Sequence, residues 1–205
     1  MKKLLKFALL GAMAIGIITG CSKNDDDDEN DVNNHTNNEA NSYTNSAYYS
    51  FTPPTSWTVG TVGTVRTVRT FGTVRTVGTA LGEIVTFTGP VDGGFSPNMN
   101  IATEQFDETL EAYTDLYVNY ILTTLFSDAK VISQSEEFQT NGSLKGKKIV
   151  YTLRVSGVNY RLVQYYISPK VSSNVFAVIS GAGLATWGDK YDAMFDTAAK
   201  SFAWK

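Results

Sequence analysis

The residues that most often carry out catalysis or bind metals are scarce in this sequence. Its 205 residues include one cysteine, Cys21, and one histidine, His35. A Ser-His-Asp or Cys-His mechanism needs a histidine base beside the nucleophile, and His35 lies in a polar stretch outside any predicted element. A cysteine and histidine metal cage lacks its ligands for the same reason. The sequence therefore predicts no nucleophilic triad, no metal and no cofactor.

Carboxylates remain as candidate acids and bases. Three groups stand out: Glu104, Asp107 and Glu108; Glu136 and Glu137; and Asp189, Asp192 and Asp196. The first group lies near the start of a predicted helix, and could hydrolyse a substrate only if two members faced one cleft. The second pair is adjacent on a predicted strand and points to opposite faces, which disfavours a glycosidase. The third group lies along one side of a helix with Lys200 four residues after Asp196, and we interpret it as a solvated face.

One glycine pattern resembles a nucleotide-binding loop only in part. Gly181-Ala182-Gly183 has the first two glycines of GxGxxG, but Thr186 stands where the third would be. The pattern follows a predicted antiparallel strand and does not open a βαβ unit. We interpret it as a turn, and an enzyme is not expected.

Cys21 stands at the end of an apolar segment. Lys2, Lys3 and Lys6 precede an uncharged run from residue 7 to residue 20. A membrane-spanning helix needs roughly 20 apolar residues, so this run fits a cleaved signal peptide better. Its last residues, Ile-Thr-Gly-Cys, resemble the lipobox of bacterial lipoproteins. That resemblance implies cleavage between Gly20 and Cys21, and lipidation of Cys21 by diacylglyceryl and acyl (palmitate-type) chains that hold the mature protein on a membrane.

The charge of the remaining chain is unevenly distributed. Residues 22–56 hold one lysine and seven acids and are rich in asparagine, whereas residues 57–205 have a net charge of zero. So polar a segment buries too little apolar surface to offset its ordering entropy. We predict a disordered acidic tether over residues 21–56. The neutral remainder has no basic face that would indicate nucleic acid binding.

A tripeptide repeat follows the tether. Residues 58–79 repeat Thr-Val-Gly and Thr-Val-Arg, with one Thr-Phe-Gly. A period of three matches neither the strand period of 2 nor the helix period of 3.6, but it matches polyproline II. One edge of such a helix would carry Arg66, Arg69 and Arg75, which could contact an anionic glycan or lipid. The interpretation we favour for residues 57–80 is a low-complexity linker with some strand character.

Residues 81–205 are predicted to form one folded domain. Alternating apolar residues and turn signals at Asn141-Gly142 and Ser156-Gly157 predict strands at 83–87, 98–102, 130–139, 146–155, 159–168 and 173–180. Apolar residues three and four positions apart predict an amphipathic helix of about five turns: Phe106, Leu110, Tyr113, Tyr117, Ile121 and Leu125. A second helix near the C-terminus is marked by Trp187, Tyr191 and Phe195. The predicted class is α+β, an antiparallel sheet of about six strands flanked by two helices in an α/β/α sandwich.

Several segments of this domain resemble the PsbP-like superfamily, which includes DcrB-type lipoproteins. They are FSPNMNI at 95–101, NGSLKGKKIVY at 141–151, Gln164-Tyr165-Tyr166, VFAVISG at 175–181 and FDTAAKSF at 195–202. The resemblance covers residues 81–205 and implies an antiparallel sheet with helices on both faces. It implies a binding or assembly factor without enzyme chemistry.

These observations predict a membrane-anchored envelope lipoprotein that acts as a non-catalytic binding or accessory factor. The expected partners are the membrane, through Cys21, and an envelope protein or small ligand. Tyr160, Tyr165, Tyr166 and Trp187 are candidate binding aromatics, of which at least two are expected in the core. The expected location is the outer membrane, on its periplasmic or surface face, or otherwise the cell membrane. The alternatives are a structural or antigenic surface lipoprotein and, less favoured, a carboxylate-based hydrolase.

Overall fold

The computed structural model describes residues 43, 46–65, 68–70, 77–79, 82–119, 122, 126, 128–170 and 173–205. The predicted signal peptide, the cleavage site at Gly20 and Cys21, and His35 lie outside the described residues. Within the described part of the chain, none of the helices reaches the length and apolarity that a membrane crossing requires.

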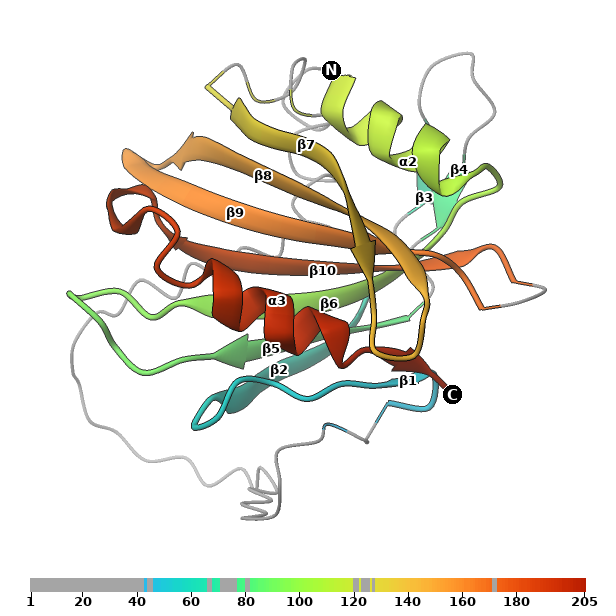
Figure 1. Ribbon diagram of the computed structural model, residues 1–205, viewed down its shortest axis with the longest axis horizontal. Coiled ribbons are helices and arrows are strands. Elements are labelled where there is room, and N and C mark those ends of the chain that lie inside the picture. Colours follow the sequence, from blue (N-terminus) through green and yellow to red (C-terminus); the bar gives the residue numbers. More distant parts are fainter. Residues whose placement is uncertain are drawn as a thin grey trace.

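Seven strands form one antiparallel sheet (Figure 1). In spatial order they are β2 (Thr58–Val65), β5 (Gly82–Thr88), β6 (Asn98–Gln105), β10 (Val175–Leu184), β9 (Val158–Ile167), β8 (Lys145–Val155) and β7 (Lys130–Gln139). Every neighbouring pair is antiparallel. The predicted α+β class is confirmed, and so are the six predicted strands: β7 has the predicted ends, and the other five differ slightly at theirs. The seventh strand comes from the tripeptide repeat.

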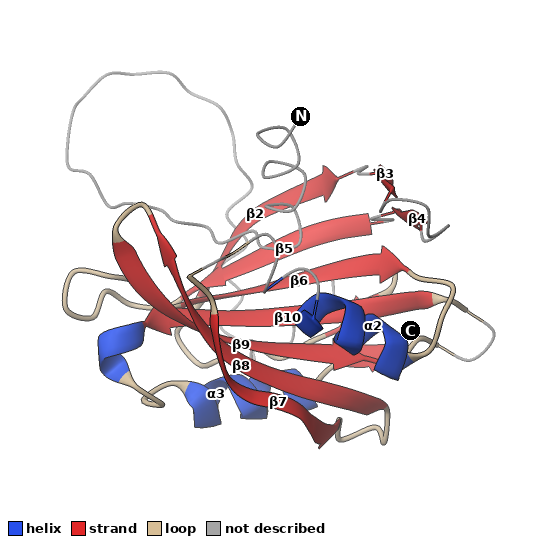
Figure 2. Ribbon diagram, turned by 90° about the horizontal axis from the view of Figure 1, so that it is seen from above, coloured by secondary structure: helices blue, strands red, loops and turns tan. Residues whose placement is uncertain are grey.

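The two faces of the sheet bury different cores because side chains alternate along each strand. On β9, Leu162 and Tyr166 contribute to the core under helix α2 (Leu110–Leu116), whereas Val163 and Tyr165 contribute to the core under α3 (Asp192–Lys200). Figure 2 shows the sheet as one twisted layer with α3 along its lower side. The helices therefore cover opposite faces, as the sandwich prediction requires.

Helix α2 begins later than predicted, and the described residues 117–119 continue it in a wider helical turn. It begins after Thr109, whose side chain accepts a hydrogen bond from the Ala112 amide at 3.2 Å and caps the helix. Phe106 lies in the loop before the helix, and its backbone amide donates to the Asn174 carbonyl at 2.9 Å. The Phe106 ring is buried, as predicted. Ile121 and Leu125 lie outside the described residues.

A strap of residues 46–57 belongs to the fold, although we predicted residues 46–56 to be disordered tether and Trp57 to begin the linker. Its strand β1 (Tyr49–Ser50) pairs with β11 (Ala203–Trp204) at the C-terminus. Tyr49 and Phe51 are fully buried on the α3 side, and the Phe51 ring lies 5.1 Å from that of Phe87. The tether prediction is wrong for these residues because their aromatic rings supply apolar area that outweighs the polar composition around them.

The tripeptide repeat also belongs to the fold, so the predicted linker over 57–80 is wrong where the chain is described. Strand β2 pairs with β5, and β3 (Val68–Thr70) pairs with β4 (Val77–Thr79). In β2 the register shifts once, so that Val59 stands opposite Phe87 and Val62 opposite Val85. Phe87 and Val85 both belong to the α3-side core. The extra residue of the bulge thus converts a period of three into the period of two that a strand needs. Arg66 and Arg75 lie outside the described residues.

Candidate functional site

Two glycines of β10 let aromatic rings pack directly on the sheet. A Cβ atom on Gly181 would stand 2.6 Å from the Phe195 ring, and one on Gly183 would stand 3.2 Å from Trp187. Both glycines lie inside the strand, so the predicted turn at 181–183 is wrong. The physical reason is that glycine is needed here for a close approach of side chains, not for a bend.

An aromatic row runs from the end of β10 into α3. Trp187 ends the short helix η2 (Ala185–Trp187), and its ring centroid lies 5.2 Å from that of Tyr191. Tyr191 in turn lies 6.1 Å from Phe195 on α3. Phe95, from the loop between β5 and β6, packs against Trp187 from the other side at 5.6 Å. Trp187, Tyr191 and Phe195 lie in one row, as their spacing in the sequence indicates, although regular helix begins only at Asp192.

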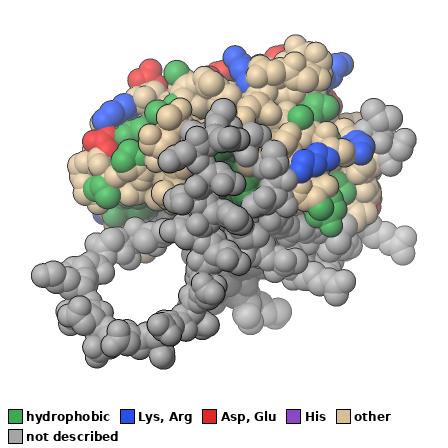
Figure 3. All heavy atoms as spheres, turned by 90° about the horizontal axis from the view of Figure 1, so that it is seen from below, with side chains coloured by type: hydrophobic (Ala, Val, Ile, Leu, Met, Phe, Trp, Pro, Cys, Tyr) green, Lys and Arg blue, Asp and Glu red, His purple; other side chains and the backbone are tan. Residues whose placement is uncertain are grey.

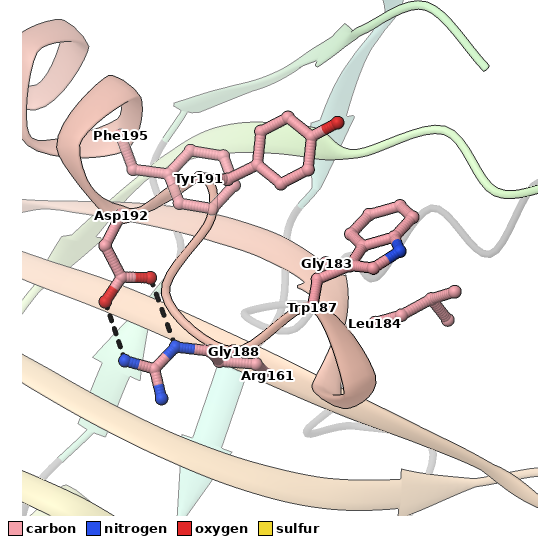
Figure 4. A pocket seen from close by; sticks show the side chains of 8 residues that line it. All are labelled: Arg161, Gly183, Leu184, Trp187, Gly188, Tyr191, Asp192 and Phe195. Carbon is pink, nitrogen blue, oxygen red and sulfur yellow. Dashed lines mark hydrogen bonds and ion pairs between the residues drawn. The ribbon is translucent and has the colours of Figure 1, made fainter. Parts of the chain in front are cut away.

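A small hollow opens beside this row (Figure 4). It encloses about 180 Å³, part of it open to solvent. Its lining consists of Arg161, Gly183, Leu184, Trp187, Gly188, Tyr191, Asp192 and Phe195, and we call it the Trp187 pocket. The hollow is shallow and includes open solvent, so it offers a surface for contact and does not enclose a drug-sized ligand.

A bidentate ion pair forms one wall of the Trp187 pocket. Arg161 donates from Nη2 to Asp192 Oδ2 at 2.7 Å and from Nε to Oδ1 at 3.1 Å. Both side chains are largely buried, and the hydrogen bond to Asp192 raises the pKa of the guanidinium. The pair fixes the direction of the Arg161 head group and joins α3 to β9.

This pairing corrects the prediction of a solvated acidic face on the second helix. Asp189 is exposed as predicted, but Asp192 and Asp196 face the sheet. Asp196 accepts from Tyr165 Oη at 2.5 Å and lies 2.8 Å from Lys148 Nζ. Strands β8 and β9 thus supply the cations, and Lys200 is not the partner of Asp196. Sequence spacing identifies pairs within a helix but not pairs between a helix and a distant strand.

The loop between β5 and β6 is fastened to the Trp187 pocket by Asp92. Its carboxylate accepts from Tyr191 Oη at 2.6 Å and from the Lys190 ammonium. Lys190 and Tyr191 hold the pKa of Asp92 below its ordinary value, and burial with the Asp92 contact raises the pKa of Tyr191 to about 12. Lys190 also lies over the Trp187 ring at 5.6 Å from its centroid. Sequence reasoning missed Asp92 and Lys190 because 98 residues separate them.

The candidate aromatics divide between core and surface. Tyr160, Tyr165 and Tyr166 are buried, so the prediction that at least two of the four belong to the core is confirmed. Trp187 is the partly exposed member. Exposed apolar side chains also occur on the elements that build its pocket, with Val91 on the Asp92 loop 75% exposed and Met194 on α3 40% exposed. The surface around Trp187 is therefore mixed, with apolar, aromatic and charged groups.

The carboxylates considered for hydrolysis lie in different environments. Glu104 is buried under α2 and accepts from Tyr113 Oη, whereas Asp107 and Glu108 are exposed in the loop before the helix. On β7, Glu137 pairs with Lys147, and Glu136 accepts from Ser133. Among the described residues, no three acidic, histidine or cysteine side chains gather as metal ligands would.

Comparison with known proteins shows similarity in structure only. No protein-family model and no curated protein matches the chain. LpqN of Mycobacterium tuberculosis, described as involved in cell envelope biogenesis, has a TM-score of 0.53 at 9% identity, over 77% of this chain and 83% of its own. PA94 of Pseudomonas aeruginosa, a protein of unknown function described as a candidate regulator, has a TM-score of 0.50 at 12% identity, over 58% of this chain and 80% of its own. The fold is thus an α+β architecture that a cell-envelope protein also uses.

Proposed function

We propose that this protein is a lipid-anchored accessory factor of a bacterial cell envelope. It binds another envelope protein through the Trp187 pocket and carries out no catalysis. The anchor is the lipidated Cys21, and the domain belongs with the PsbP-like, DcrB-type lipoproteins. Its place is the outer membrane, on the periplasmic or the surface face, or otherwise the cell membrane.

The observation that carries the binding role is the composition of the Trp187 pocket. Tryptophan, tyrosine and arginine dominate the residues on which protein complexes depend most, and Trp187, Tyr191 and Arg161 line one small hollow. Each is already held in place, by Gly183, Asp92 and Asp192 respectively. A partner that packs an apolar or aromatic side chain against these residues would therefore bind without a large ordering cost.

The envelope location is supported by two independent features. The segment before Cys21 resembles a lipoprotein signal, and LpqN, which shares the fold, is described as involved in cell envelope biogenesis. The shallow, partly open form of the pocket favours contact with a protein surface over enclosure of a drug-sized ligand.

The anchor is tested by replacing the lipidated residue. The Cys21→Ser variant is expected to accumulate as an unlipidated precursor and to lose metabolic labelling with palmitate. The Ser22→Ala variant, altered at the next residue, should be processed and labelled normally. Normal labelling and membrane retention of Cys21→Ser would overturn the anchor.

The binding site is tested by crosslinking in intact cells. Trp187→Ala is expected to lose a crosslinked partner that the unaltered protein retains, since removal of such a residue costs about 2 kcal/mol or more, roughly a 30-fold loss of affinity. Val131→Ala, at an exposed position on β7, is the control and should keep the partner. An unchanged set of partners for Trp187→Ala, with an unchanged melting temperature, would remove the pocket from the proposal.

A further inference from the structure

The two edges of the sheet differ in how they are protected. Strand β7 ends one side, and its register with β8 shifts twice, between Val131 and Ser133 and between Ser133 and Glu136. It also carries charges at Lys130, Glu136 and Glu137. Bulges and charges are the usual devices that keep an edge strand from pairing with another chain.

Strand β2 ends the other side and lacks most of that protection. Thr58–Val65 contains no charged residue and no proline. Its one register shift falls between Val59 and Val62, and from Val62 to Val65 it pairs with β5 without interruption. In the described part of the chain no strand pairs with its outer side, and Val59 is 50% exposed. Among the described strands, β2 is therefore the outermost on this side of the sheet, the position from which a strand can pair with another chain.

We propose that β2 pairs antiparallel with β2 of a second copy of this chain. The result is one continuous sheet with seven strands from each copy, related by a twofold axis perpendicular to the sheet. Like the strand itself, residues 57–205 carry no net charge, so this part of the chain adds no net repulsion between two copies. In the space-filling view of Figure 3, acidic and basic side chains both appear among the coloured atoms. A twofold contact of this kind closes on itself and forms a dimer, not a fibre.

The position of the strap agrees with this arrangement. Tyr43, Tyr49 and Phe51 lie on the α3 side of the sheet. A twofold axis perpendicular to the sheet leaves the α3 sides of both copies facing the same way, so both chains enter their domains from that side. Two chains anchored in one membrane require entry from the same side. Only this step of the argument depends on the proposed anchor at Cys21.

The repeat affects the register of the dimer. In antiparallel pairing of two Thr-Val-Gly strands, a shift by three residues restores the same opposed residue types, but it turns one copy over because side chains alternate between the two faces. Only shifts by an even number of residues keep the α3 sides of both copies on the same face, as the twofold axis requires. An edge contact alone buries little area, so the dimer is expected to be weak in solution and favoured where copies are concentrated on a membrane.

The test uses the mature chain with Cys21→Ser, which then contains no cysteine. Adding Val62→Cys places a single thiol at the middle of the Val59–Val65 span. Opposed residues of antiparallel strands lie about 4.5–5.5 Å apart between Cα atoms, within the range that a disulfide bridges. Oxidation is expected to give a crosslinked dimer, whereas Ile132→Cys, at a position on β7 that is 54% exposed, gives at least tenfold less.

Sedimentation measures the same contact without a crosslink. The Cys21→Ser chain should dimerise as its concentration is raised, and an added Val59→Lys should strongly weaken this, because a charged side chain on an edge strand opposes pairing with another strand. Ile132→Lys should dimerise normally. A chain that stays monomeric at the highest concentration, or equal crosslinking through Val62→Cys and Ile132→Cys, would overturn the proposal. Loss of dimerisation in Ile132→Lys, with the fold intact by circular dichroism, would also overturn it. None of these three results would affect the proposal that the Trp187 pocket binds a partner.

Discussion

Substitution of Gly181 by alanine tests the packing of α3 on the sheet. The new Cβ atom would stand 2.6–2.8 Å from three ring carbons of Phe195, whereas carbon atoms pack best at about 3.5–4.0 Å. The Phe195 ring has little room to move away, because the ring centroids of Trp57 and Tyr191 lie 6.2 and 6.1 Å from its own. The strain has to appear as a shift of α3 or as a distorted side chain.

The expected cost follows from two opposing effects. Overpacking a core typically costs about 1–3 kcal/mol, and the reduced freedom of the unfolded chain with alanine offsets about 0.4–1 kcal/mol. The net loss in the free energy of unfolding is about 1–2 kcal/mol. A domain of this size loses about 2–4 °C per kcal/mol, so the melting temperature should fall by about 2–8 °C.

Thermal melts followed by circular dichroism, with urea unfolding for the free energies, measure this effect. Gly142→Ala is the matched control, because its Cβ would find no atom nearer than 3.9 Å, and its stability should not fall. Adding Phe195→Leu to Gly181→Ala should give a smaller loss than the sum of the two single losses, since the smaller side chain relieves the overlap. Wild-type stability of Gly181→Ala, or strictly additive losses, would refute the packing argument.

Three further predictions concern the ion pair, the strap and the buried tyrosines. In urea unfolding, a double-mutant cycle on Arg161→Met and Asp192→Asn should give a coupling of about 1–2 kcal/mol, and a coupling near zero would contradict the bidentate pair. Trp57→Ala should lower stability by about 3 kcal/mol in the same assay, whereas a tether residue would change nothing. Burial raises the pKa of Tyr151 and Tyr166 well above the ordinary 10, so stability is complete below about pH 10 and falls as the pH rises further. Tyrosinate absorbance and circular dichroism should therefore change together in alkali, and early absorbance change without unfolding would contradict their burial.

Local patterns predicted most of the sheet, including its edge strand β7, but missed the opposite edge strand β2. Alternation along Ile149–Val155 and the Ser156-Gly157 turn are local signals, and both appear where expected, with Ser156 and Gly157 at positive φ. The repeat was misread because a period of three fits a strand only when a bulge absorbs one residue, and the bulge depends on β5. The strap was misread because composition averages over residues, whereas burial depends on a few large rings.

The candidate site could be predicted only in part. The spacing of Trp187, Tyr191 and Phe195 is visible in the sequence and gave the aromatic row. The contacts that fix the row come from Asp92 and Arg161, which lie on other elements and are joined to it only by the fold. Nothing in the immediate neighbourhood of either residue distinguishes it from an ordinary loop or strand charge.

The pairing of β1 with β11 determines how the domain responds to tension. The Lys205 amide donates to the Tyr48 carbonyl at 2.9 Å, and its ammonium donates to the Ser46 carbonyl at 2.7 Å, so the chain enters the domain beside its own C-terminus. A pull on the chain at the N-terminal end of the strap would load this two-residue ladder and the rings of Tyr49 and Phe51 before any strand of the main sheet. The strap would detach first, and the chain would lengthen under load while the seven-stranded sheet stays folded.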